Sequence, residues 1–279
     1  QLGDLMSDML ITLTVLGPDS AGLAVYSDSA GYNLTVKINA AVDLFPNLEG
    51  WLTKNVPGTT MRRLSTHAVI SGPADLGLTL PAALADAFPQ LRIMSGGAAM
   101  EVFKEVGLPR DVAARFNLRD MAGTHGIGHT RMATESAVTT DGAHPFSTGD
   151  DQCLVHNGSL SNHNALRRKL ARQNVTVSSQ NDSEVAAAYL TWKMREGANL
   201  GEALEMGLND LDGFYTFVVG TRNGFGVLRD PIACKPAVLA ETEDYVAFGS
   251  EYRALVGLPG IDTARVWEPE PATVYFWER

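Results

Sequence analysis

Four short polar motifs constrain this chain more than any other feature of its sequence. They occupy residues 128–134 (Gly-His-Thr-Arg-Met-Ala-Thr), 144–146 (His-Pro-Phe), 156–158 (His-Asn-Gly) and 181–184 (Asn-Asp-Ser-Glu). Arg131 can bind an α-carboxylate through two parallel hydrogen bonds, and Asp182 can accept from an α-ammonium group. Asn157 and Gly158 can direct a side-chain amide and a backbone N–H at a developing oxyanion. The motifs therefore predict a site for a small amino acid such as glutamine.

Composition narrows the class of protein. The chain has 279 residues, 45% of them hydrophobic, which is enough for a sizeable core. Its net charge of −10 argues against nucleic acid or an anionic membrane as a partner. We expect no transmembrane helix and no signal peptide, because long apolar runs and a basic N-terminal region are missing. Two cysteines, and six histidines without metal-site spacing, predict a cytoplasmic protein without a metal.

The pattern of apolar residues predicts helices and strands in blocks. Helical spacing over residues 2–13 predicts an amphipathic first helix, and residues 23–27 and 31–39 are expected to be strands. Pro81 is expected to open a helix that ends at Phe88. Asn223-Gly224 between two apolar segments predicts a β-hairpin. Blocks of this kind favour α+β layers over strict βαβ alternation.

Each motif also has an ordinary structural interpretation. Arg131 could form a surface ion pair, Asn157-Gly158 could be a turn, and Asp182 could cap a helix. His144 could only shape a loop. We favour the functional interpretation because Asn157-Gly158 follows an apolar strand and precedes a helix, and because the motifs occur together.

In this order the motifs resemble those of the class II, N-terminal-nucleophile (Ntn) glutamine amidotransferases. The resemblance implies an α+β fold, the four-layer αββα sandwich of Ntn hydrolases. We expect a single domain over residues 1–279 with an inserted α/β segment at about 57–120. The resemblance assigns the oxyanion hole to Asn157 and Gly158, and substrate binding to Arg131, Thr134, His144 and Asp182.

Within that family, residues 154–164, 210–217 and 267–275 resemble the glutaminase-type subunit of N-methylglutamate synthase and related glutamate-synthase-like complexes. The resemblance implies a hetero-oligomer in which ammonia passes to a separate FMN-binding subunit, with an iron–sulfur cluster as a further candidate cofactor there. This chain itself is expected to hold no cofactor, because Ser95-Gly96-Gly97 is too short for a nucleotide-binding loop.

The chain departs from the family pattern at the nucleophile. The family uses an N-terminal cysteine whose α-amino group acts as the base, and Gln1 cannot replace it. Cys153 is expected to be a packed core thiol. Leu16 also occupies the position of a family arginine, and Glu135-Ser136 replaces the usual His-Gly.

Two explanations stay open for this departure. The sequence could be truncated by about 10–15 residues that carry the cysteine strand. Alternatively, the protein could be a catalytically inactive regulatory or scaffolding subunit that binds glutamine or glutamate. An independent Ntn amide hydrolase is a third class, and it needs the same nucleophile. In each case we expect the chain that starts at Gln1 to be inactive as a glutaminase.

Overall fold

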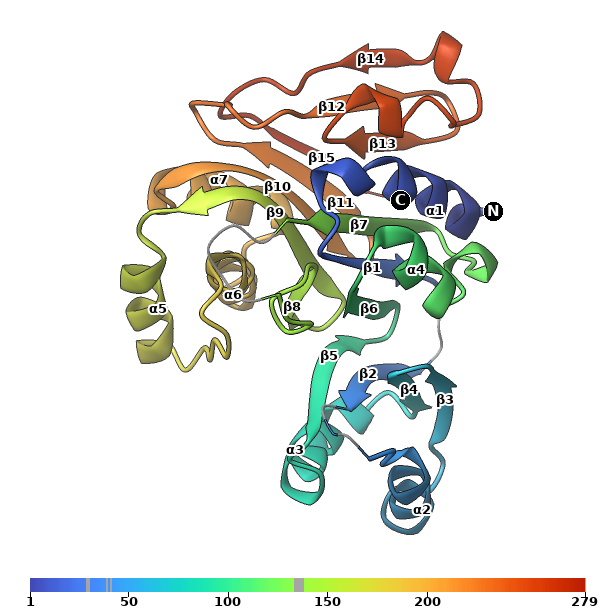
Figure 1. Ribbon diagram of the computed structural model, residues 1–279. Coiled ribbons are helices and arrows are strands. Elements are labelled where there is room, and N and C mark those ends of the chain that lie inside the picture. Colours follow the sequence, from blue (N-terminus) through green and yellow to red (C-terminus); the bar gives the residue numbers. More distant parts are fainter. Residues whose placement is uncertain (29–30, 39, 41, 133–137, 279) are drawn as a thin grey trace.

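The main body of the protein has four layers: helices, two facing layers of β-sheet, and helices again (Figure 1). The computed structural model describes all residues except 29–30, 39, 41, 133–137 and 279. The α+β four-layer architecture predicted from the sequence is confirmed. None of the helices within the described part of the chain is long and apolar enough to cross a lipid bilayer.

The first β-layer consists of two antiparallel three-stranded sheets with the strand orders β6-β1-β7 and β13-β12-β14. Their strands are β1 (Ser20–Tyr26), β6 (Met100–Val106), β7 (His125–Arg131), β12 (Val238–Glu241), β13 (Val246–Gly249) and β14 (Arg265–Trp267). Their outer face is covered by α1 (Leu2–Thr12) and α4 (Pro109–Arg115), with the 3-10 helices η1 (Thr14–Leu16), η2 (Leu118–Asp120), η3 (Tyr252–Ala254) and η4 (Ile261–Thr263) between elements.

Helix α1 packs on both of these sheets. Met6 and Leu10 belong to the apolar cluster that includes residues of β1 and β6. Leu5 and Met9 pack against the cluster that includes residues of β12. The apolar residues that predicted an amphipathic helix in the sequence are therefore the ones that bury this helix.

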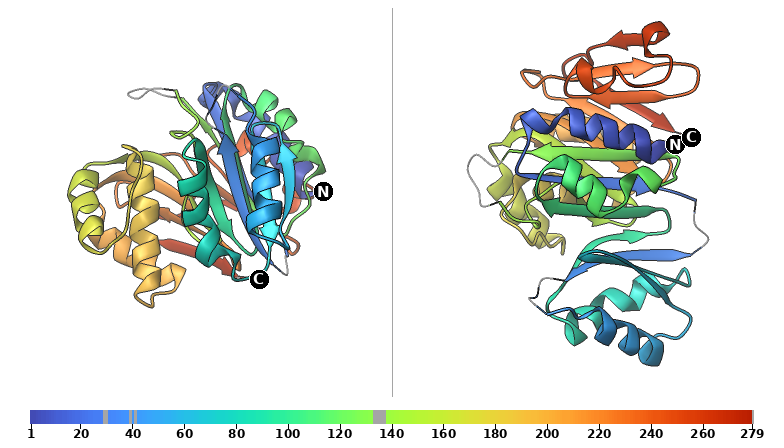
Figure 2. Two further views of the ribbon diagram at one scale, coloured as in Figure 1. Left: turned by 90° about the horizontal axis from the view of Figure 1, so that it is seen from below. Right: turned by 45° about the vertical axis from the view of Figure 1, so that its right-hand side comes forward.

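The second β-layer is one antiparallel sheet with the order β15-β11-β10-β9-β8. Its strands are β8 (Phe146–Gly149), β9 (Gln152–Leu160), β10 (Gly213–Thr221), β11 (Gly224–Arg229) and β15 (Val274–Glu278). Its outer face is covered by α5 (His163–Arg172), α6 (Asp182–Arg195) and α7 (Leu200–Asp210) (Figure 2). Strands β10 and β11 form the hairpin predicted from Asn223-Gly224, which is confirmed.

The two β-layers enclose a common core. Residues of β1 and β7, such as Tyr26 and Ile127, pack against Val155 and Val218 of the second sheet, and Leu239 of β12 belongs to the same cluster. Both sheets of the first layer therefore face the second sheet, which makes the main body a true sandwich.

A separate α/β module projects from this sandwich between β1 and β6 (Figure 1). Its elements are β2 (Tyr32–Ile38), α2 (Phe45–Asn55), β3 (Thr60–Leu64), β4 (His67–Gly72), α3 (Leu76–Ala87) and β5 (Leu91–Gly97). The order βαββαβ and the antiparallel sheet β3-β4-β2-β5 give the split-βαβ, ferredoxin-like topology. Both helices share one apolar core with one face of that sheet.

The bounds of this module differ from those expected for the insertion. The module lies between residues 32 and 97, so it shares only residues 57–97 with the segment predicted at 57–120. Strand β6 and helices α4 and η2 pack in the main body instead. The start of α3 also differs from the prediction, because Pro81 lies inside the helix. Leu76, Leu80 and Leu84 bury one side of α3, and this burial offsets the backbone hydrogen bond that Pro81 cannot make.

Candidate active site

Arg131 ends β7, and the strand beside it brings the 144–146 motif close. Gly22 on β1 pairs with His129, and a Cβ atom on Gly22 would collide with the carbonyl oxygen of His144. Only glycine allows this approach of the His144 loop to the strand. The motifs at residues 128–134 and 144–146 therefore lie close together at the end of β7.

Asn157 and Gly158 lie within strand β9 and do not form a turn. They pair with Thr216 and Tyr215 of β10. Gly158 has a φ of +140°, and a Cβ atom there would collide with the carbonyl oxygen of Phe214. The ordinary interpretation as a turn is therefore wrong, and the strand that was expected to end before these residues continues through them to Leu160.

Asp182 begins α6 but does not cap it. The cap is Asn181, whose side chain accepts a hydrogen bond from the Ser183 N–H at 2.8 Å. The Asp182 carboxylate instead accepts from the Leu160 N–H at 2.9 Å. This bond fixes the carboxylate next to the end of β9, three residues after Asn157.

A hydroxyl group links three of the motifs. Ser183 Oγ lies 2.9 Å from His144 Nε2 and 3.0 Å from His156 Nδ1. Burial lowers the pKa of His144 well below its usual value, and burial lowers that of His156 to about 4 although the charge of Asp182 opposes this. Both rings are therefore neutral at pH 7. Each ring can donate to or accept from the Ser183 hydroxyl according to its tautomer, and this hydroxyl also donates to Asp182 Oδ1 at 3.4 Å.

His129 extends this cluster towards Arg131. Its ring lies 4.2 Å from that of His144, centroid to centroid. Burial, with smaller contributions from neighbouring His156 and Arg131, lowers the pKa of His129 to about 4. His129 and Arg131 are two residues apart on one strand and therefore face the same side. This alternation is the sequence signal that could have placed His129 in the site. Ser183 carried no such signal.

The structure thus brings together Arg131, His144, Asn157, Gly158 and Asp182 around the ends of β7 and β9 and the start of α6. Thr134, also predicted to bind substrate, lies outside the described residues. The roles assigned to these side chains stay predictions.

A cavity of about 260 Å³ adjoins this cluster. His129, Thr130, His156, Asn157 and Thr216 line it together with apolar residues of α1, β7, β10 and β13, and Thr124, His125 and Ser250 are further polar residues of the lining. Strands β7 and β13 are edge strands of their sheets, and both line the cavity. Among the described residues, Arg131, Gly158 and Asp182 do not line it.

Neither cysteine lines this cavity. Cys153 is buried, and the Tyr26 hydroxyl donates to its Sγ at 3.3 Å. Burial raises the pKa of Cys153 to about 11, so it is a core thiol. Cys234 is exposed. Across the described part of the chain, no group of three or more His, Cys, Asp or Glu side chains could hold a metal ion.

Comparison with known proteins identifies the family of this chain. Residues 129–257 match the family model of a glutamine amidotransferase domain. The chain is 62% identical over 281 residues to the glutamine amidotransferase-like protein GlxB of Rhizobium meliloti, covering 100% of this chain and 93% of that protein. This chain belongs to the glutamine amidotransferase family.

More distant amidotransferases share parts of the chain or its fold. An amidophosphoribosyltransferase of Methanocaldococcus jannaschii is 30% identical over 183 residues, which cover 64% of this chain and 38% of that protein. The solved glutamine phosphoribosylpyrophosphate amidotransferase from B. subtilis superposes with a TM-score of 0.63 at 18% identity, covering 99% of this chain and 44% of that chain. The fold is therefore that of the Ntn-type amidotransferases.

Proposed function

We propose that this amidotransferase chain is a glutaminase subunit. It would hydrolyse glutamine to glutamate and ammonia, and the ammonia would pass to a separate synthase subunit. The observation that carries the proposal is that Asp182 and Asn157-Gly158 adjoin one buried His–Ser–His cluster that continues through His129 to Arg131.

Each group of the site has a distinct role in this reaction. Arg131 would bind the α-carboxylate of glutamine, and Asp182 would accept from the α-ammonium group. The Asn157 amide and the Gly158 N–H would stabilise the oxyanion that forms when a thiol attacks the side-chain amide. His144 is 5% exposed, so its part would be to hold Ser183 and the start of α6 in place. Thr134 is proposed as a further contact of the substrate.

The cavity suits a strand that carries the nucleophile. Gly3 donates to the Met121 carbonyl at 3.0 Å, near the start of β7, and Thr130 Oγ1 donates to the Leu13 carbonyl at 3.3 Å, near its end. Helix α1 therefore runs in the same direction as β7. A strand that precedes Gln1 and lies between β7 and β13 would run antiparallel to β7. Its first residue would therefore lie at the end of β7, beside Asn157.

A cysteine at that first residue would complete the chemistry. Its thiol would attack the amide carbon while its own α-amine takes the proton. The proton then goes to the departing ammonia, and water hydrolyses the thioester to give glutamate and the free thiol. By resemblance, the ammonia acceptor would be an FMN-binding, glutamate-synthase-like subunit, with an iron–sulfur cluster as a second candidate cofactor on the partner subunits. N-methylglutamate synthase is the model for this hetero-oligomer. Two unpaired cysteines favour the cytoplasm as the compartment.

A regulatory or scaffolding subunit that binds glutamine or glutamate is the second candidate. One observation favours it: apolar Leu16 stands at the position of a family arginine.

One experiment separates these functions. Two extended chains are compared, one beginning Cys-Gly-Ile-Val-Gly after removal of the initiator methionine and one with serine in place of that cysteine, each joined to Gln1 by a short flexible connection. We expect ammonia release from glutamine only with the cysteine. In that chain Asn157→Ala should lower kcat, since loss of one oxyanion donor costs about 2.7–4 kcal/mol, whereas Arg131→Ala should raise KM.

The failures are informative in different ways. Glutamine binding without ammonia release, even with the partner subunit present, would favour the regulatory function. Absence of glutamine binding in a folded protein would contradict the site assignment itself.

A further inference from the structure

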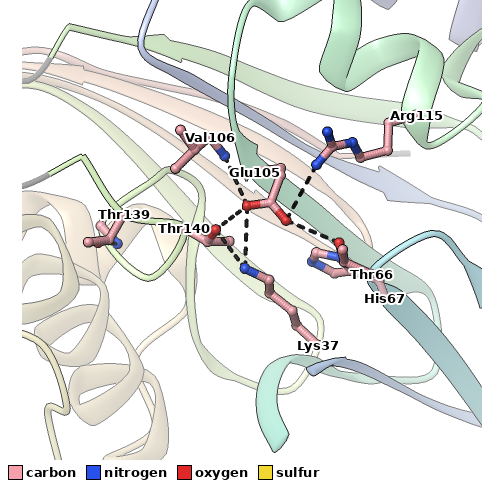
Figure 3. Close-up of polar contacts among 9 residues, drawn as sticks. Lys37, Thr66, His67, Glu105, Val106, Arg115, Thr139 and Thr140 are labelled. Carbon is pink, nitrogen blue, oxygen red and sulfur yellow. Dashed lines mark hydrogen bonds and ion pairs between the residues drawn. The ribbon is translucent and has the colours of Figure 1, made fainter. Parts of the chain in front are cut away.

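A second polar cluster joins the inserted module to the main body, and its centre is Glu105 of β6 (Figure 3). We call it the Glu105 cluster. It consists of Glu105 with Lys37 of β2, Thr66 from the β3–β4 turn, Arg115 of α4 and Thr140 from the segment that follows β7.

The hydrogen bonds of this cluster join four separate segments of the chain. Lys37 Nζ donates to Thr140 Oγ1 at 2.6 Å and to Glu105 Oε1 at 3.3 Å, and the Thr140 hydroxyl donates to Glu105. Thr66 Oγ1 donates to the second oxygen of Glu105 at 3.0 Å. Both side chains of the Lys37–Glu105 pair are at most 10% exposed. The pair is therefore only weakly screened by water.

The Glu105 carboxylate is held in its charged form. Burial by itself would raise its pKa, but the hydrogen bonds from Thr140 and from the Val106 N–H, together with the charge of Lys37, outweigh burial and keep the pKa below its usual value. The ionic contact between module and body is therefore present at neutral pH.

Thr140 belongs to a turn that contacts Arg131. The Ala143 N–H donates to the Thr140 carbonyl at 3.1 Å, and the Gly142 N–H donates to Thr139 Oγ1 at 3.1 Å. A Cβ atom placed on Gly142 would lie 3.5 Å from Arg131 Nη1. The turn formed by residues 139–142 therefore borders the guanidinium group proposed to bind the glutamine carboxylate.

Strand β6 holds this segment at a second point. Lys104 points to the opposite face of β6 from its neighbour Glu105, and its Nζ donates to the carbonyl oxygens of Ala143 and Pro145 at 2.8 and 3.1 Å. Lys104 thus fixes the part of the segment that leads into His144. Glu105 and Lys37 fix the part that borders Arg131.

We propose that Lys37 and Glu105 are positioning residues for glutamine binding, through which the ferredoxin-like module holds the 139–142 turn against Arg131. The inference rests on the proposed binding of glutamine by Arg131. The inserted module would then set the geometry of the carboxylate-binding end of the site.

The test uses two variants of the cluster and one matched control. Lys37→Met removes the cation that the module contributes. Thr140→Val removes the bridging hydroxyl but keeps the Lys37–Glu105 ion pair. The second variant keeps the proposal testable if the first one misfolds. The control is Arg62→Met. Arg62 on β3 pairs with Glu101 of the same strand β6 at 2.6 Å, so it also joins module and body, but neither residue contacts the 139–142 turn.

Binding of two ligands is measured by calorimetry. L-glutamine carries the α-carboxylate, and L-glutaminamide has a neutral amide in its place. We expect Lys37→Met and Thr140→Val to weaken glutamine binding by about tenfold and to leave glutaminamide binding within twofold. Arg62→Met should change neither. Unchanged glutamine affinity in both folded cluster variants, or an equal loss for both ligands, would overturn the proposal.

Hydrogen exchange of residues 138–145 gives a second measurement that needs no ligand. Exchange should become faster in Lys37→Met and Thr140→Val but not in Arg62→Met, and equal rates in all proteins would refute the coupling. If the unaltered protein binds no glutamine, the proposed function fails, while the exchange result still tests the link between module and turn.

Discussion

The buried histidines of the site should make the protein lose stability as the pH falls from 7.5 to 5. Burial lowers the pKa values of His129 and His156 from 6.5 to about 4. Between these two values the unfolded chain binds protons that the folded protein does not, so the free energy of unfolding falls with decreasing pH. The effect begins near pH 6.5 and is complete below pH 4.

The size of this loss follows from the pKa difference. A difference of about 2.5 pH units corresponds to at most about 3.4 kcal/mol for each histidine. At pH 5, where the folded rings remain mostly neutral, the loss is about 2 kcal/mol for each. A change of this size is a large fraction of the stability of a typical domain.

The assay is urea unfolding at a series of pH values for the unaltered protein and for His129→Gln. The glutamine side chain introduced at position 129 does not titrate. Between pH 7.5 and 5, the free energy of unfolding of the variant should therefore fall by about 2 kcal/mol less than that of the unaltered protein. Equal losses in the two proteins would refute the reasoning, because they would mean that His129 takes up its proton in the folded state.

Three further outcomes are expected. Ser183→Ala should lower the free energy of unfolding by about 2–4 kcal/mol, because it removes the partner of two buried ring nitrogens, while Ser183→Thr should retain most of the stability in the same urea assay. Asp151→Asn should cost about 1.5–3 kcal/mol, since the Asp151 carboxylate accepts from the N–H groups of Ala98, Ala99 and Met100; an unchanged denaturation midpoint would contradict this. Cys153→Ala should leave ammonia release by the cysteine-extended chain unchanged, and its abolition would make this thiol the nucleophile.

Local features of the sequence were sufficient for some of the regular elements. The apolar spacing of residues 2–13 predicted α1, and Asn223-Gly224 predicted the β10–β11 hairpin, because both signals act between residues close in sequence. The helix around Pro81 was misplaced for the opposite reason. Its start depends on burial of Leu76 and Leu80 against the module's sheet, and this contact has no local signature.

The candidate site was predictable as a set of residues but not as an arrangement. The motif order identified Arg131, Asn157 and Asp182, since each carries chemistry that suits an amino acid. The sequence alone could not show that Asn181 caps α6, that Ser183 joins two histidines, or that Asn157-Gly158 lies inside a paired strand.

The sequence by itself therefore determined the family, the layered α+β class and the chemical groups of the candidate site. The tertiary structure decided which of these groups meet and what holds them in place. Lys37 and Glu105 lie 68 residues apart, and Thr140 lies 103 residues from Lys37. Contacts over such separations depend on the register of several strands and on the burial of charges from water, and neither is encoded in any short segment of the chain.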